Sequence, residues 1–148
     1  MSQYEHILVA VDESPISYAA VEHALELARA FKSKVTLLSV IAIDPFIAVD
    51  FYKVAPAITE HFIKAEEQAL LRLNDLKSSF ERDGIDVSVK VVHGVSPSEG
   101  ILKTVETDSV SLVMMGSHGR TGLQKMVLGS VAQNVLNASV VPVFIVKQ

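Results

Sequence analysis

The stretch VSLVMMGSHGRTGLQKMVLGSVAQ (residues 110–133) carries an apolar run, then a glycine-rich segment, then the start of a helical pattern. Four of the chain's seven glycines lie in it, namely Gly116, Gly119, Gly122 and Gly129. The apolar run is typical of a strand buried on both faces. The pair Gly129-Ser130 predicts the start of a helix that continues through Asn137.

The same alternation of strand and helix extends over the whole chain. Apolar runs typical of strands occupy residues 6–12, 34–42, 87–92, 109–115 and 141–146. Helical patterns begin at Ser14-Pro15, near residue 56 (to 83), at Ser98 (to Glu106) and at Gly129-Ser130. Gly84 is placed to end the second helix, and Lys90 suits an edge strand. We therefore predict one α/β domain over residues 1–148, an open parallel sheet with helices on both faces.

Residues 43–56 do not fit this alternation. They are apolar and aromatic but have no clear period, so the sequence predicts a loop. Such a loop would serve as a lid or contact surface, or would pack on its own domain.

Composition narrows the classes of function. The net charge of −4 gives a nucleic-acid partner no overall electrostatic support. The chain has no cysteine, which excludes disulfides, thiolate zinc sites and cysteine catalysis. No apolar run approaches the roughly 20 residues of a membrane span, and the N-terminal residues lack a signal-peptide pattern. We expect a cytoplasmic protein that binds neither nucleic acid nor membranes.

The glycine-rich segment is the candidate binding site. In an open α/β sheet, ligands bind beyond the carboxyl ends of the strands where the winding reverses, and a strand order of 3-2-1-4-5 would bring the first and fourth strand ends together there. Glycines allow backbone N–H groups to approach a ligand closely, and a helix start favours an anion. His118, Arg120 and Lys125 add possible cationic donors. These features predict a phosphate-binding site.

Two alternatives need no ligand. Gly116 and Gly119 would then only form a turn, and Ser130 with Gln133 would form a capping box at the start of the last helix. The segment is neither a Walker A loop nor a G-x-G-x-x-G motif after the first strand.

The segment GSHGRTGLQKMVLGS has the form G-x2-G-x9-G-S and resembles the ATP-binding signature of the universal stress protein family. The segments ILVAVDESPIS, VVHGVSPSEGIL and SVVPVFIV also resemble that family. The resemblance implies a five-stranded parallel sheet of order 3-2-1-4-5, a Rossmann-like fold of the adenine nucleotide alpha-hydrolase type. It also implies one ATP per subunit and a homodimer paired through the last strand, residues 141–146.

The same resemblance implies the roles of individual residues. Asp12 would accept hydrogen bonds from the ribose hydroxyls, and Val40 would contact the adenine edge. The adenine and ribose sites would fall at Ala10, Asp12 and Val40, and Met115 and Gly116 would close the crevice between the first and fourth strands. The phosphates would be surrounded by Gly116, His118, Gly119, Arg120, Thr121, Gly122, Gly129, Ser130, Val131 and Ala132. Mg²⁺ is expected from the chemistry of a triphosphate, not from any cluster of ligands.

A structural explanation that needs no ligand also exists for three of these residues. Asp12 would only cap the helix that follows it, Val40 would only be a strand residue, and His118 would only be an exposed turn residue. The remaining histidines, His6, His23, His61 and His93, show no metal-ligand spacing.

Three functions remain open. The first, which we favour, is a nucleotide-binding stress-response module in which ATP changes shape, assembly or partners. The second is a slow ATPase or autophosphorylating enzyme, although no water-positioning residue is evident and Glu13 is a weak candidate. The third is a dimeric interaction module without nucleotide. No catalytic and no metal-binding residue is assigned.

Overall fold

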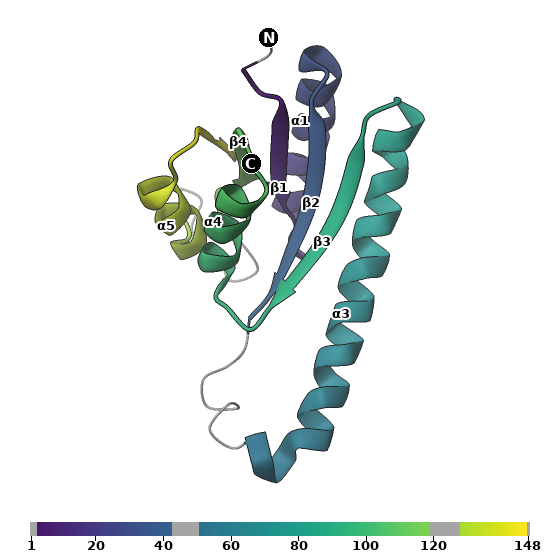
Figure 1. Ribbon diagram of the computed structural model, residues 1–148, viewed down its shortest axis with the longest axis vertical. Helices are drawn as coiled ribbons and strands as arrows, with labels where there is room; N and C mark the ends of the chain where they lie inside the picture. The colour runs from purple at the N-terminus through teal and green to yellow at the C-terminus, as the bar shows by residue number, and fades with distance from the viewer. Residues whose placement is uncertain (1–2, 43–50, 119–127, 148) are drawn as a thin grey trace.

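The computed structural model describes residues 3–42, 51–118 and 128–147, with the backbone alone for 51–59. Five strands form one parallel sheet in the order β3-β2-β1-β4-β5, as expected (Figure 1). Their bounds are His6–Ala10 (β1), Lys34–Ile41 (β2), Val87–His93 (β3), Leu112–Gly116 (β4) and Val143–Val146 (β5). β3 is an edge strand, which confirms the prediction made from Lys90.

Helices cover both faces of the sheet. They are α1 (Pro15–Phe31), α3 (Phe51–Arg82), α4 (Pro97–Thr107) and α5 (Ser130–Ala138). α1 and α3 pack on one face, and α4 and α5 lie together on the other (Figure 1). None of the helices in the described part of the chain is both long enough and apolar enough to span a membrane.

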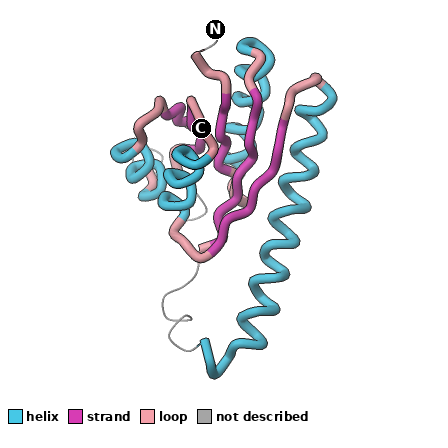
Figure 2. Tube along the Cα trace, viewed as in Figure 1, coloured by secondary structure: helices cyan, strands magenta, loops and turns pink. Residues whose placement is uncertain are grey.

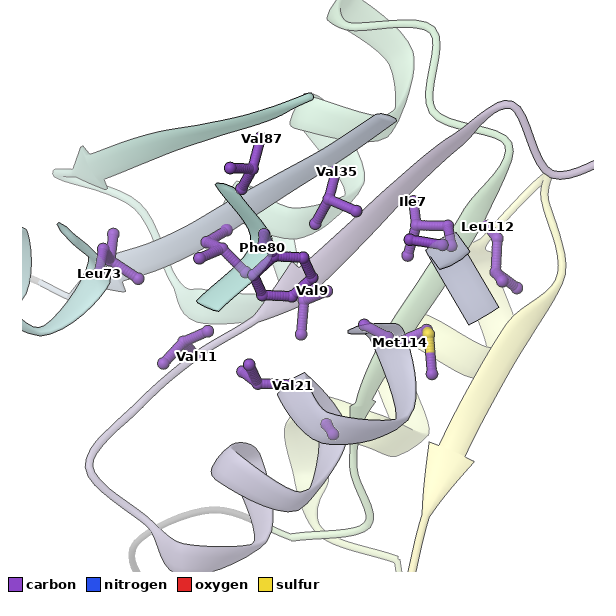
Figure 3. Close-up of a cluster of buried hydrophobic side chains, with 14 of the residues drawn as sticks. Ile7, Val9, Val11, Val21, Val35, Leu73, Phe80, Val87, Leu112 and Met114 are labelled. Carbon is purple, nitrogen blue, oxygen red and sulfur yellow. The ribbon is translucent and has the colours of Figure 1, made fainter. Parts of the chain in front are cut away.

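The core consists of two apolar clusters, one on each face of the sheet. Successive strand residues point to opposite faces, so Ile7 and Val9 join the cluster with Val21 of α1 and Phe80 of α3 (Figure 3). Leu8 points the other way, into the cluster beneath α4 and α5. Complete burial of one such side chain contributes roughly 1.5–3 kcal/mol. The two clusters therefore hold the three layers together.

Several strand ends differ from the predicted ones for local reasons. The fourth strand begins at Leu112 and not at residue 109, because Ser109 has a φ of 54°, which is incompatible with an extended strand. The fifth begins at Val143, because Pro142 has no N–H to donate to the ladder. The carbonyl of Pro142 still accepts from the N–H of Val113 at 3.0 Å.

The second helix begins earlier than predicted, at Phe51, so residues 51–56 are helical and not part of a loop. A continuous apolar run hides helical periodicity, and Pro56 breaks the pattern further because it cannot donate a helical hydrogen bond. The trace of α3 turns sharply near its start (Figure 2). Residues 43–50 lie outside the described residues.

The end of α3 confirms the prediction for Gly84. Its φ is 73°, its N–H donates to the carbonyl of Glu81 at 3.0 Å, and Ile85 N–H donates to that of Phe80 at 3.1 Å. These two hydrogen bonds form a Schellman motif, whose left-handed residue is usually glycine.

A buried histidine occupies the amino end of β1. His6 Nδ1 lies 3.0 Å from the carbonyl of Asp108, and Nε2 lies 2.7 Å from Thr36 Oγ1. Since a carbonyl only accepts, Nδ1 carries the proton and Nε2 accepts from the Thr36 hydroxyl. Burial lowers the pKa of His6 below its ordinary value of 6.5 despite the opposing effect of the Asp108 carbonyl.

We predict that the free energy of unfolding falls as the pH is lowered through 6.5. Because the pKa of His6 is lowered in the folded state, the unfolded chain binds the proton more tightly. The contribution of neutral His6 is complete above 6.5 and is lost as the pH falls toward the folded-state pKa. Urea unfolding at about pH 8 and about pH 5.5 measures this slope.

His6→Gln should flatten the pH dependence of the free energy of unfolding, whereas His61→Gln, at an exposed position of α3, should retain it. An unchanged slope in His6→Gln would contradict the assignment.

Candidate functional site

The carboxyl ends of β1 and β4 lie side by side, paired through Ile7–Leu112, Leu8–Val113 and Val9–Met114. The chain leaves β1 into α1 on one face of the sheet and leaves β4 toward α5 on the other (Figure 1). The winding therefore reverses between these two strands. This is where open α/β sheets bind ligands.

The turn after β1 holds Asp12 by its side chain. Asp12 Oδ1 accepts from the N–H of Ser14 at 2.7 Å and from the Ser14 hydroxyl. Ser14 is the N-cap residue of α1, as its position predicts, but its side chain does not cap the helix. Asp12 does not cap it either, since its partner is Ser14 and not an amide of the first helical turn. The carboxylate instead forms an Asx turn.

Ser17, in the first turn of α1, holds the backbone of the same turn. Its Oγ lies 3.0 Å from the carbonyl of Asp12 and 3.0 Å from that of Ser14, and it accepts from Asp12 N–H at 3.2 Å. Ser14 and Ser17 are both buried. The backbone and the carboxylate of Asp12 are thus fixed by two different side chains.

The end of β2 forms the next wall. Val11 N–H donates to the carbonyl of Leu38 at 2.8 Å, and Ser39 Oγ donates to the carbonyl of Val11 at 2.9 Å. These hydrogen bonds keep the exit of β1 against β2, next to Val40. The side chain of Val40 packs against Gly100 of α4, where a Cβ would lie 2.7 Å from Val40 Cγ2.

The end of β4 packs against α1. Met115 is buried in the cluster beneath α4 and α5, to which the half-buried Ala10 of β1 also belongs. Gly116 faces the other way, and a Cβ there would lie 2.7 Å from Ile16 Cγ2. Its φ is not positive. The missing side chain of Gly116 therefore lets Ile16 approach β4, a role that sequence reasoning did not foresee.

The glycine-rich segment is closed at its base. The carbonyl of Ser117 accepts from Gly129 N–H at 2.8 Å, and Ser117 N–H donates to the carbonyl of Val146 at 2.9 Å. A Cβ on Gly129 would lie 3.0 Å from His118 Cα. His118 Nδ1 lies 2.9 Å from Ser117 Oγ. Gly129 thus allows two backbone segments to meet.

The start of α5 differs from the capping box considered above. Gly129 is the N-cap residue and Ser130 is the first helical residue, so Ser130 is not positioned to cap, and no side-chain cap is formed. Gln133 N–H donates to the carbonyl of Gly129. Within the described ranges, the N–H groups of Ser130, Val131 and Ala132 have no backbone acceptor. Three amides at a positive helix end can therefore receive an anion.

The structure thus brings together the ends of β1, β2 and β4 and the start of α5. The predicted site residues on these elements are Ala10, Asp12, Val40, Met115, Gly116, His118, Gly129, Ser130, Val131 and Ala132. The remaining predicted residues, Gly119, Arg120, Thr121 and Gly122, lie outside the described residues, as does Lys125.

Four residues contact the predicted site residues, and the sequence did not reveal these contacts. They are Ser14, Ile16, Ser17 and Gly100. The sequence also did not reveal the ion pair between Glu13 Oε1 and Arg72 of α3, 3.7 Å apart. A pairing with this much exposure contributes at most about 1 kcal/mol. It nevertheless links the turn after β1 to the long helix.

The fold defines an α/β protein with an open parallel sheet whose switch point lies between β1 and β4. A profile of the Universal stress protein family matches residues 3–147. Universal stress protein MJ0531 of Methanocaldococcus jannaschii is 31% identical over 145 residues, covering 98% of this chain and 83% of that protein. The chain therefore belongs to the universal stress protein family.

Solved structures agree with this assignment. The structure of MJ0577, also from Methanocaldococcus jannaschii, has a TM-score of 0.83 and 33% identity, covering 99% of this chain and 97% of the other. The universal stress protein from Archaeoglobus fulgidus in complex with dAMP has a TM-score of 0.67 and 20% identity, covering 97% and 98%. The second likeness is one of fold.

We predict that Gly100→Ala lowers the free energy of unfolding by about 1–3 kcal/mol, the usual effect of overpacking. The added Cβ would lie 2.7 Å from Val40 Cγ2, and a β-branched side chain cannot easily turn away. Adding Val40→Ala removes the obstructing methyl groups, so the double variant should lose less stability than the sum of the single variants. Urea unfolding of all four chains measures this coupling. Simple additivity would contradict it.

Proposed function

We propose that this protein binds ATP in the crevice between the carboxyl ends of β1 and β4. The observation that carries the proposal is the hydrogen bond from Gly129 N–H to the carbonyl of Ser117, next to three amides of α5 that have no backbone acceptor among the described residues. Those amides and the helix dipole favour a phosphate group. The dAMP complex of a relative with the same fold supports an adenine nucleotide as the ligand.

In this proposal each wall of the crevice has its own part of the nucleotide. Asp12 accepts hydrogen bonds from the ribose, the backbone of Val40 contacts the adenine edge, and Ala10, Met115 and Gly116 complete the pocket. His118 and the amides of α5 contact the phosphates. Gly119, Arg120, Thr121 and Gly122 are assigned to the phosphates from the sequence motif alone.

Mg²⁺ would arrive with the triphosphate. In the described part of the chain, no group of three or more His, Asp or Glu side chains could hold a metal ion. A triphosphate supplies its own oxygen ligands, and Mg²⁺ usually keeps several waters. The ion would neutralise phosphate charge and needs no protein cage.

Binding is favoured over turnover. Hydrolysis needs a group that positions the attacking water, and Glu13, the carboxylate considered for that role, lies in an ion pair with Arg72. We propose a regulatory module of the stress response, in which the bound nucleotide alters assembly or partners.

We predict that protein purified without added nucleotide carries an adenine nucleotide, or binds ATP in calorimetry. Gly129→Ala should weaken the affinity for ATP about tenfold or more, the usual effect of losing one hydrogen bond to a charged group. A Cβ only 3.0 Å from His118 Cα would move the start of α5 away from β4.

The matched control is Gly84→Ala at the far end of the sheet. There a Cβ meets no atom within 4 Å, but the φ of 73° opposes it, so stability should fall while affinity stays unchanged. ATP retained intact over hours supports binding, whereas its conversion to ADP supports the slow enzyme. Wild-type protein that carries no nucleotide after purification and gives no heat with ATP would refute the proposal and leave the nucleotide-free module.

We further propose a homodimer formed by edge-to-edge pairing of β5, residues 143–146 within the predicted 141–146. Within the described residues β5 pairs with β4 alone, and Phe144, 39% exposed, lies against His23 with ring centroids 5.8 Å apart. An uncovered apolar edge strand promotes aggregation unless it is paired or shielded. Pairing about a two-fold axis covers both copies at once.

We predict that Phe144→Asp shifts the dimer to monomer, as measured by light scattering. Phe144 is a better test than Ile145, because Ile145 packs into the core beneath α4 and α5 and its replacement would also disturb folding. Leu71→Asp is the matched control, because Leu71 is 73% exposed on α3 and lies away from β5. A folded Phe144→Asp protein that stays dimeric would place the interface elsewhere.

A further inference from the structure

Two helices of this protein start with the same pair of residues but use the serine differently. Ser96-Pro97 begins α4, and Ser96 Oγ accepts from Glu99 N–H while the Glu99 carboxylate accepts from Ser96 N–H. This is a complete capping box. Ser14-Pro15 begins α1 in the same extended N-cap conformation, yet Ser14 makes no side-chain cap.

The Ser14 hydroxyl points back to the turn before the helix. It donates to Asp12 Oδ1, the same oxygen that accepts from Ser14 N–H at 2.7 Å. If the Ser14 side chain capped the helix, it would accept from the N–H of Ser17. That N–H instead donates to the carbonyl of Ser14 at 3.2 Å. The fold therefore gives up a side-chain cap and gains a carboxylate held by two donors on one oxygen.

This arrangement fixes the direction of the second carboxylate oxygen. In the described part of the chain, both side-chain hydrogen bonds of Asp12 involve Oδ1, and no Lys, Arg or His forms an ion pair with it. Asp12 is half-buried, and a carboxylate oxygen can only accept hydrogen bonds. It repels phosphate and suits hydroxyl groups of a sugar.

We propose that Ser14 is a positioning residue that makes the site selective for the hydroxyl groups of the nucleotide's sugar. It holds Asp12 Oδ1 so that Oδ2 accepts from the ribose. Ser17 contributes differently, because it binds the backbone of Asp12 and not its carboxylate. The inference rests on the proposed nucleotide site and adds to it a residue and a basis for ligand selectivity.

The test compares the affinities for ATP and for 2′,3′-dideoxy-ATP, which lacks both sugar hydroxyls. Wild-type protein should bind ATP more tightly. Ser14→Ala should weaken ATP about fivefold, the usual effect of one hydrogen bond, and leave the dideoxy nucleotide almost unchanged. The ratio of the two affinities should therefore fall toward one. Ser14→Thr keeps the hydroxyl and should keep the wild-type ratio.

Ser96→Ala is the matched control, since it removes a true capping serine from the other Ser-Pro helix start. It should lower stability without changing the ratio of affinities. Asp12→Asn provides a second route if Ser14→Ala does not fold. Because Ser14 offers two donors to one oxygen, the Asn carbonyl must take that place. The amide nitrogen then faces the sugar, and the preference for ATP should be lost.

The outcomes separate the two proposals. If wild-type protein binds neither nucleotide, the proposed function fails. If it binds both equally, or if Ser14→Ala weakens both by the same factor, the nucleotide site stands and the role of Ser14 is refuted. Loss of the ratio in Ser14→Ala but not in Ser96→Ala or Ser14→Thr establishes it.

Discussion

Ser117 is the residue on which the rest of the site depends. It is buried at the end of β4, where its N–H is bonded to the carbonyl of Val146 and its carbonyl accepts the N–H of Gly129. One residue thus joins the end of β4, the end of β5 and the start of α5. A displacement of Ser117 has to break these hydrogen bonds or move the elements attached to them. The candidate phosphate site and the edge strand β5 are therefore mechanically connected.

The glycines around the proposed site permit close packing between elements of the protein itself. Gly116 admits Ile16 of α1, Gly100 admits Val40 of β2, and Gly129 admits the backbone of His118. None of these three glycines has a positive φ. Each missing side chain lets a neighbouring element approach closely, and this packing sets the spacing of the elements around the proposed nucleotide site.

Much of this fold could be predicted from the sequence, because buried parallel strands leave unbroken apolar runs and helices leave a regular stripe. In α3, for example, Ala69, Leu73 and Phe80 are buried at helical spacing. Local backbone chemistry was harder to predict. The φ of Ser109 and the start of α3 at Phe51 leave no signal in an apolar run.

The internal partners of the candidate site could not be predicted from the sequence. Ser14-Pro15 and Ser96-Pro97 look alike, and the difference lies in their neighbours. Glu99 stands three residues after Ser96 and completes a capping box, whereas Ser14 has Asp12 two residues before it and Ser17 three residues after it. The Ser17 side chain is too short to reach the N–H of Ser14 as Glu99 reaches the N–H of Ser96. The Ser14 hydroxyl therefore donates to the Asp12 carboxylate.

Polar groups are arranged in opposite ways at the amino and carboxyl ends of the parallel strands. At the amino ends, His6 is hydrogen-bonded to the carbonyl of Asp108 and to the hydroxyl of Thr36, and Lys90 forms an ion pair with the Asp108 carboxylate at 3.1 Å. At the carboxyl ends, Asp12 accepts hydrogen bonds through Oδ1, and the first amides of α5 have no backbone acceptor within residues 3–42, 51–118 and 128–147. Buried polar groups in proteins are nearly always paired. An acceptor and several donors at the same ends of the strands suit the nucleotide proposed above, which carries hydroxyls on its sugar and negative charge on its phosphates.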